Sequence, residues 1–121
     1  MMTVSPHLRD VSPAAVHKMM RERSIVLIDV REPQEYVAER IHGALLFPLS
    51  TFDPKALPSP ESCEIVFHCG TGKRSALAVA KCLELGIAHT AHMAGGIQAW
   101  KAARLATITL DPASGGVVDR R

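Results

Sequence analysis

Several residue types are scarce in this chain, and each scarcity narrows its possible functions. Only 3 of the 121 residues are cysteine, and their spacing forms no CxxC pair, which argues against a disulfide framework and a zinc ribbon. Aromatic residues make up 4% and the net charge is +2, so nucleic acid is not an expected partner. No apolar run is long enough to span a membrane. We therefore expect no metal site and no membrane contact, and we expect a reducing cytoplasmic location.

The length of 121 residues and mass of 13.1 kDa predict a single domain. Residues 1–10 are polar and resemble no signal peptide, so we interpret them as an N-terminal extension. The domain itself is predicted over residues 11–106. Residues 107–121 include Pro112, Gly115 and Gly116, and this tail is expected to be loose.

Strand and helix patterns alternate along the predicted domain. Strands are predicted near residues 25–30, 44–47, 64–68 and 90–93, and helices near 13–22, from 33, from 74 to 85, and over 97–103. This order indicates an α/β fold with a mostly parallel sheet and helices on both faces. In such sheets, sites lie at the carboxyl ends of the strands, where Asp29–Arg31 and Cys69–Arg74 fall.

The segment 65–75, with the sequence IVFHCGTGKRS, places a cysteine where a predicted strand ends and a helix is about to begin. Gly70 and Gly72 allow a tight turn, so that several backbone N–H groups point at one spot. These amides, with the positive end of the helix dipole, favour the thiolate of Cys69 over the thiol. We therefore predict that Cys69 is a nucleophile in contact with bulk water rather than a buried structural thiol.

Three segments of the chain together resemble the single-domain form of the rhodanese family of sulfurtransferases. They are residues 28–44, beginning IDVRE and ending IHGA, the Cys69–Ser75 loop, and GGIQAW over residues 95–100. The family often has a histidine where this chain has Arg40, and His42 occupies a variable position, so no catalytic role is assigned to His42.

The resemblance implies the substrates and the reaction. The Cys69 thiolate would take the outer sulfur of a donor such as thiosulfate, and a cyanide or thiol acceptor would then remove it. A sulfur-relay protein is a possible partner, and no cofactor is expected. The mechanism would be covalent and ping-pong.

Four residues separate Cys69 from Arg74, whereas the related phosphatases and arsenate reductases have five. The shorter loop suits a single sulfur atom better than a tetrahedral oxyanion, so sulfur transfer is favoured. A non-catalytic binding module and a protein-directed persulfide carrier stay open as alternatives, and the phosphatase or arsenate reductase interpretation comes last.

The predicted substrate-binding residues follow Cys69 in the loop: Gly70, Thr71, Gly72, Lys73, Arg74 and Ser75. Lys73 and Arg74 stand at a helix start, where the dipole disfavours cations, and this suggests binding of a dianionic donor. Ser75 is expected to cap the helix or to hydrogen-bond the sulfur, because no His/Asp pair is placed to activate it.

Residues outside the loop receive more modest roles. Arg31 is expected to pair with Glu35 four residues on, with substrate contact as the lesser alternative. Asp29 is interpreted as a hydrogen-bond acceptor that anchors a loop. The side chain of His68 should point to the face of the sheet opposite Cys69. The remaining expectations concern packing: Cys82 and Trp100 should lie in the core, and Cys63 at the far end of the central strand.

Overall fold

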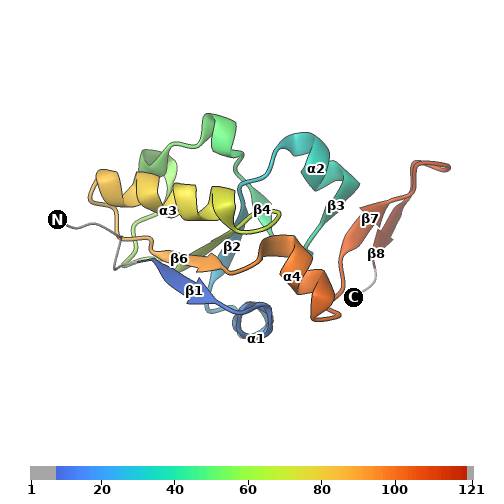
Figure 1. Ribbon diagram of the computed structural model, residues 1–121, viewed down its shortest axis with the longest axis horizontal. Helices are drawn as coiled ribbons and strands as arrows, with labels where there is room; N and C mark the ends of the chain where they lie inside the picture. The colour runs from blue at the N-terminus through green and yellow to red at the C-terminus, as the bar shows by residue number, and fades with distance from the viewer. Residues whose placement is uncertain (1–7, 120–121) are drawn as a thin grey trace.

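The structure is a computed structural model that describes residues 8–119, and it contains a five-stranded parallel sheet (Figure 1). The strand order across the sheet is β1 (Arg9–Val11), β6 (Ala91–Met93), β5 (Ile65–His68), β2 (Val26–Asp29) and β4 (Leu45–Leu46). Every pair of neighbours is parallel, which requires a crossover between them. The predicted fold class is therefore confirmed, and β5 lies at the centre of the sheet.

Helices cover both faces of this sheet. Helices α1 (Pro13–Arg21) and α4 (Gly96–Ala102) lie below it in Figure 1, and α3 (Lys73–Glu84) lies above it. Along β5, Val66 joins the core under α1 and α4, whereas Ile65 and Phe67 join the core under α3. This alternation follows from the two-residue period of a strand, and it buries the strand on both faces.

The helix boundaries follow local signals in the sequence. The Ser12 side chain accepts a hydrogen bond from the Ala15 N–H and caps α1, whose first residue is Pro13. Helix α2 (Pro33–Ala38) also begins with proline, after Glu32. Between β4 and β5 the chain forms two short 3₁₀ turns, Leu49–Thr51 and Pro54–Ala56.

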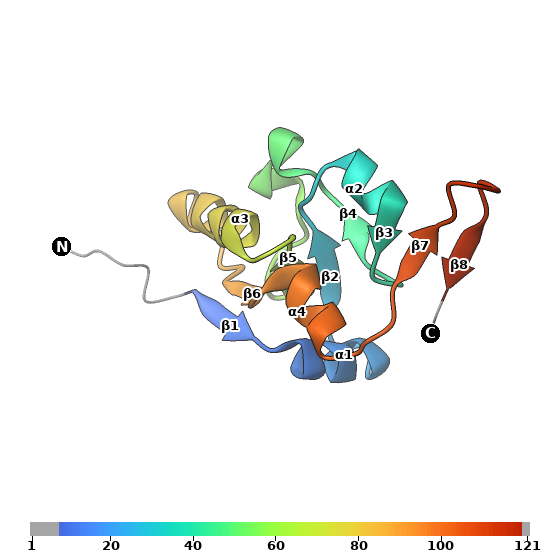
Figure 2. The same ribbon diagram turned by 45° about the vertical axis from the view of Figure 1, so that its right-hand side comes forward.

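A second, antiparallel sheet lies to one side of the parallel sheet (Figure 2). It includes part of the segment that was predicted to be a loose tail. It contains β3 (Glu39–Arg40), β7 (Ile108–Leu110) and β8 (Val117–Asp119). The expectation that residues 107–121 are loose is wrong for this hairpin, because the β7–β8 pair is anchored on β3. Residues 120–121 of the predicted tail lie outside the described part of the chain.

The start of the domain also differs from the prediction. Strand β1 begins at Arg9, so Arg9 and Asp10 belong to the parallel sheet and not to an extension before residue 11. Residues 1–7 of the predicted extension lie outside the described residues. Within residues 8–119, no helix is both long and apolar enough to cross a membrane.

Candidate active site

The loop after β5 places Cys69 at the carboxyl end of the central strand, directly before α3. Gly72 forms the helix cap with φ +111°, a left-handed conformation that glycine adopts without steric cost. This conformation turns the chain back over the cysteine. The sequence prediction of a strand, a tight glycine turn and a helix start is confirmed here.

The Cys69 sulfur accepts hydrogen bonds from the loop that it precedes. The Gly72 N–H donates to Sγ at 3.1 Å and the Ser75 N–H at 3.3 Å, and the Ser75 hydroxyl lies 3.6 Å away. Burial of the sulfur raises the pKa of the thiol, but donors from Ser75, Gly72 and Thr71 outweigh it, so the pKa falls below the ordinary 9.0. The loop therefore favours the thiolate, as predicted.

The expectation that Cys69 contacts bulk water is wrong for this structure. The residue is only 1% exposed, because the loop folds over the sulfur and α3 packs beside it. The Arg74 guanidinium lies near the loop, with one terminal nitrogen 3.4 Å from the point that a Cβ on Gly70 would occupy. Access to the sulfur from solvent therefore requires a local shift of this cover, so ionisation and access are separate properties of the site.

The start of α4 supports the loop from below. The Ile97 N–H donates to the Cys69 carbonyl at 2.8 Å, and the Gln98 N–H donates to the Gly70 carbonyl at 3.1 Å. The approach is so close that a Cβ on Gly96 would lie 2.3 Å from the Cys69 carbonyl oxygen. Gly96 thus allows the backbones of α4 and the Cys69 loop to approach closely.

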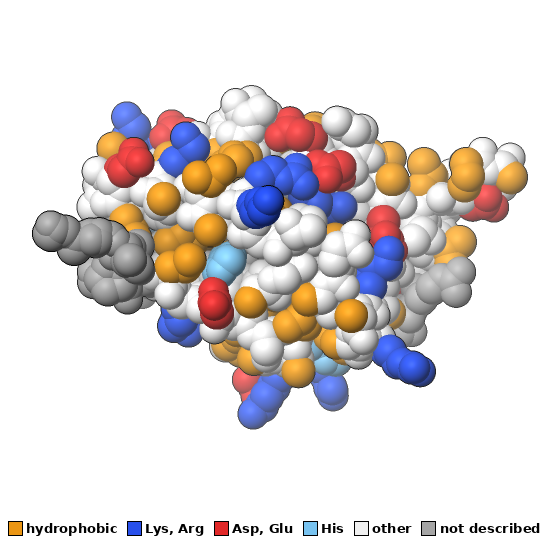
Figure 3. Space-filling model, viewed as in Figure 1, with side chains coloured by type: hydrophobic (Ala, Val, Ile, Leu, Met, Phe, Trp, Pro, Cys, Tyr) orange, Lys and Arg blue, Asp and Glu red, His pale blue; other side chains and the backbone are white. Residues whose placement is uncertain are grey.

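The two loop cations have different surroundings. Arg74 makes a bidentate ion pair with Glu35 of α2, at 2.7 and 3.0 Å, and this pair lowers the pKa of Glu35 to about 2. Lys73 is exposed and has no ion pair among residues 8–119. Figure 3 shows Lys and Arg side chains next to Asp and Glu side chains near the start of α3. Of the two predicted donor-binding cations, Lys73 is thus the one available to an incoming anion.

Arg31 does not make the predicted pair with Glu35. Its side chain is buried and bonded to the Asp29 carboxylate, with the shortest contact at 2.8 Å, and it also donates to the Glu39 carbonyl at 2.6 Å. The buried Asp29 carboxylate attracts the guanidinium more strongly than the partly exposed Glu35, which Arg74 holds. Arg31 anchors the chain after β2, and Asp29 is the anchoring acceptor that we expected.

His68 points away from Cys69, as the strand period predicts. Its Nδ1 lies 3.2 Å from the Cys69 carbonyl oxygen, and its Nε2 lies 3.4 Å from Asp29 without the alignment of a hydrogen bond. Burial lowers the pKa of His68, so the ring is neutral near pH 7. His68 therefore acts in packing and not as a base for Cys69.

Ser75 is joined to a His/Asp pair that the sequence interpretation missed. Its hydroxyl lies 2.8 Å from His92 Nδ1, and His92 Nε2 lies 2.7 Å from an Asp10 carboxylate oxygen. Asp10 of β1 and His92 of β6 occupy paired positions in the parallel ladder. These two residues are 82 positions apart, and only the pairing of β1 with β6 brings them together. The statement that no such pair is placed near Ser75 is wrong.

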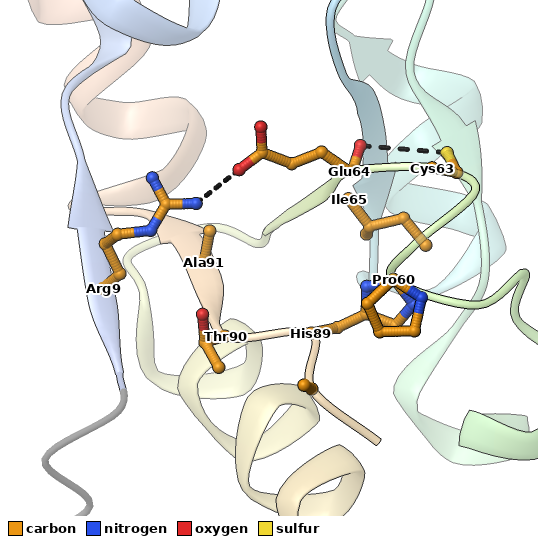
Figure 4. Close-up of a pocket in the computed structure, with 9 residues that line it drawn as sticks. Arg9, Pro60, Cys63, Glu64, Ile65, His89, Thr90 and Ala91 are labelled. Atoms are coloured by element: carbon orange, nitrogen blue, oxygen red, sulfur yellow. Dashed lines mark hydrogen bonds and ion pairs between the residues drawn. The ribbon is translucent and has the colours of Figure 1, made fainter.

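The other cysteines lie in different environments. Cys82 is fully buried in α3, and burial raises the pKa of its thiol to about 11, which agrees with the expected core role. Cys63 lines a pocket of about 270 Å³ at the opposite end of β5 from Cys69. Figure 4 shows the Cys63 sulfur directed at the Glu64 carbonyl, while Arg9 reaches across to the Glu64 carboxylate. Neither thiol has the amide donors found at Cys69.

Possible metal ligands are not clustered in the described part of the chain. Within residues 8–119, no group of three His, Cys, Asp or Glu side chains is close enough to hold a metal ion.

Comparison with known proteins identifies the family. A model of the rhodanese-like domain matches residues 12–103, which is most of the chain. The chain belongs to the rhodanese-like family. The resemblance carried by the three sequence segments is therefore confirmed, and the Cys69 loop lies within the matched region.

Three similar proteins illustrate the range of this family. An uncharacterized protein of Synechocystis is 35% identical over 81% of this chain, which spans 55% of that protein, about half its length. A sulfurtransferase of Allochromatium vinosum is 27% identical over 74% of this chain and 83% of its own. The crystal structure of a rhodanese-related protein from Thermoplasma volcanium has a TM-score of 0.71, with 27% identity over 82% of this chain and 96% of that one. Of these three, the Allochromatium vinosum protein is the one named a sulfurtransferase.

Proposed function

We propose that this protein transfers a sulfane sulfur from an anionic donor such as thiosulfate to a cyanide or thiol acceptor, through a persulfide on Cys69. The observation that supports this most is the set of hydrogen-bond donors around the Cys69 sulfur, because they stabilise a thiolate without a metal. The family and the relative named a sulfurtransferase support the same class of reaction.

The proposed chemistry needs two displacements at sulfur. In the first, the Cys69 thiolate attacks the outer sulfur of thiosulfate, a new S–S bond forms, and sulfite leaves with the electron pair of the broken S–S bond. In the second, the acceptor attacks the terminal sulfur of the persulfide, and the electron pair of the Cys69–sulfur bond returns to Cys69. No external oxidant or reductant is required, and the scheme predicts ping-pong kinetics.

The loop residues have separate roles in this scheme. The amides of Thr71, Gly72 and Ser75 hold the sulfur, and the flexibility of Gly70 and Gly72 gives the loop room to open. Lys73 attracts the dianionic donor from solvent, and Arg74 shapes the entrance through Glu35. Arg31 holds the chain after β2 through its ion pair with Asp29. A thiol chemistry of this kind suits a reducing compartment such as the cytoplasm.

Intact-mass spectrometry after thiosulfate addition tests the proposal. The expected result is a gain of one sulfur, about 32 Da, that cyanide removes. The gain should be absent in Cys69→Ala and present in Cys63→Ala and Cys82→Ala, which serve as matched controls. Absence of the adduct in the unaltered protein would contradict a thiosulfate-type reaction and favour the binding module. An adduct formed only with a protein persulfide would favour the protein-directed carrier.

A further inference from the structure

Four side chains form a continuous chain of contacts from the buried sulfur to the protein surface. Cys69 Sγ lies 3.6 Å from Ser75 Oγ, Ser75 Oγ lies 2.8 Å from His92 Nδ1, and His92 Nε2 lies 2.7 Å from Asp10. Ser75 is fully buried and His92 nearly so, whereas the Asp10 side chain is 69% exposed. The contacts thus connect a sulfur shielded from water to a carboxylate in contact with it.

The chemistry of these groups determines where the protons lie. The Asp10 carboxylate only accepts hydrogen bonds, so His92 carries a proton on Nε2. In neutral His92, Nδ1 is then an acceptor for the Ser75 hydroxyl, and the Ser75 oxygen accepts from the Cys69 thiol. In protonated His92, Nδ1 donates to Ser75, whose hydroxyl is then free to donate to a thiolate. The same four groups fit both states without a change of position.

We propose that Ser75, His92 and Asp10 form a proton relay that removes the Cys69 proton when the persulfide forms and returns it when the persulfide is discharged. This inference rests on the proposed sulfur transfer for its timing, but its geometry does not depend on which donor is used. His92 acts on Cys69 through Ser75, so it is a positioning residue and not a catalytic one.

Atoms and charges balance through the cycle. In the first half, the Cys69 S–H bond breaks, the proton passes by way of Ser75 to His92 Nδ1, the new S–S bond forms, and sulfite leaves as a dianion. The site then holds a persulfide anion and an imidazolium. In the second half, cyanide or a thiolate takes the terminal sulfur and leaves as an anion, and the imidazolium returns its proton through Ser75 to Cys69.

The relay gives the buried Cys69 thiol a route for losing its proton. A buried thiol cannot lose its proton directly to water, and a buried anion is costly unless a counter-charge lies near. The imidazolium supplies that charge, and Asp10 stabilises the imidazolium. Asp10 lies on β1, outside the region 12–103 that matches the rhodanese-like domain.

The fold also determines which other polar and charged groups face His92 and the Cys69 sulfur. His92 faces Ser75 on α3 and Asp10 on β1, and its ring also lies near Gly72. The sulfur faces the amides of Thr71, Gly72 and Ser75, and the nearest cation that acts on it is Arg74, which Glu35 partly neutralises. Lys73 is exposed, and His68 lies on the opposite face of β5. Among the described residues, His92 is therefore the titratable group linked to Cys69 by hydrogen bonds.

The test measures alkylation of Cys69 by iodoacetamide across pH, in a Cys63→Ser, Cys82→Ala background so that Cys69 is the remaining thiol and reacts through local opening of its cover. The variants are His92→Asn and Asp10→Asn, and His89→Gln is the control, because His89 is a buried histidine bonded to the Pro58 carbonyl and not to the site. With His92→Asn, we expect the alkylation rate of Cys69 to fall about tenfold near pH 6 and to change little near pH 10. This is the pattern that a rise of about one unit in the pKa of the Cys69 thiol would produce. Asp10→Asn should shift the profile the same way by less, and His89→Gln should leave it within about twofold.

Overlapping profiles for His92→Asn, Asp10→Asn and the parent protein would overturn the relay. If His92→Asn fails to fold, the Asp10→Asn profile alone tests the relay. The Asp10 side chain is mostly exposed, so this substitution should not prevent folding. A second readout is the imidazole NMR signal of His92, which should move from neutral to protonated when thiosulfate is added and back when cyanide is added. An adduct without this change would overturn the relay alone. Failure of thiosulfate to give any adduct would count against the proposed function, while the alkylation profile would still test the relay.

Discussion

The backbone of Gly96 lies directly against the carbonyl of Cys69, so closely that a Cβ at position 96 would sit 2.3 Å from that oxygen. Gly96 also has φ +61°, which side-chain-bearing residues seldom adopt. The start of α4 and the active loop are therefore packed backbone to backbone, and the loop has its shape only because position 96 lacks a side chain.

Gly96→Ala is expected to lower the free energy of unfolding by about 3 kcal/mol, through backbone strain and the overlap with Cys69 and Gly70. Gly86→Ala is the matched control, because Gly86 has φ +72° but a Cβ there meets nothing within 4 Å. That control should cost only about 1 kcal/mol. Urea unfolding measures the free energy of unfolding of both variants. Equal losses would show that the close approach of Gly96 to Cys69 and Gly70 contributes nothing to the cost.

The buried pair of Asp29 and Arg31 predicts a large loss on neutralising one partner. Asp29→Asn leaves the Arg31 guanidinium buried without its counter-charge, and should cost about 3 kcal/mol. Glu64→Gln breaks the exposed pair with Arg9 and should cost less than about 1 kcal/mol. Thermal or urea unfolding of the two variants measures the difference. Similar small losses in both would mean that Arg31 finds another partner.

The ion pair of Glu35 with Arg74 predicts a pH-dependent stability. Because the folded pKa of Glu35 is about 2, below the ordinary 4.5, its contribution is present above pH 4.5 and is lost as the pH falls toward 2. Both side chains are about a third exposed, so solvent screening keeps this contribution below about 1 kcal/mol.

Glu35→Gln should therefore be less stable than the parent protein near neutral pH, and the difference should shrink below about pH 4. Urea unfolding at several pH values measures the two curves. A difference that stays constant across this range would mean that the carboxylate charge of Glu35 is not what holds Arg74.

Lys73 is expected to act in donor capture. Lys73→Gln removes an exposed, unpaired charge beside the loop, and should raise the KM for thiosulfate about two- to fivefold with kcat little changed. Lys81→Gln is the control, because Lys81 is exposed in the last turn of the same helix. Sulfite release at low salt measures both constants. Equal KM values for the two variants would remove Lys73 from the binding site.

The parts of this fold that depend on local pattern could be predicted from the sequence. The apolar run that forms β5, the glycine turn at Gly72 and the amphipathic α3 each carry their own signal, and together they placed Cys69 correctly. The short β7–β8 hairpin was missed, since its strands have three residues each and are stabilised by pairing with the distant β3.

Relationships between distant segments account for the errors at the site. Glu35 and Arg74 are 39 residues apart, and the expected local pair of Arg31 with Glu35 lost to the buried Asp29 and to Arg74. Asp10 and His92 meet because β1 pairs with β6, which no local pattern indicates. The burial of Cys69 was missed for a related reason, because the packing of α3 and the loop over the sulfur is tertiary.

The loop donors lower the pKa of the Cys69 thiol below its ordinary value despite the burial of the sulfur. Thiolate absorbance near 240 nm, followed across pH in a variant with Cys63→Ser and Cys82→Ala, measures this directly and does not depend on access to the sulfur. We expect a single titration with a midpoint below the ordinary 9.0. A midpoint at or above 9.0 would show that burial outweighs the loop donors, and would contradict this lowering of the pKa.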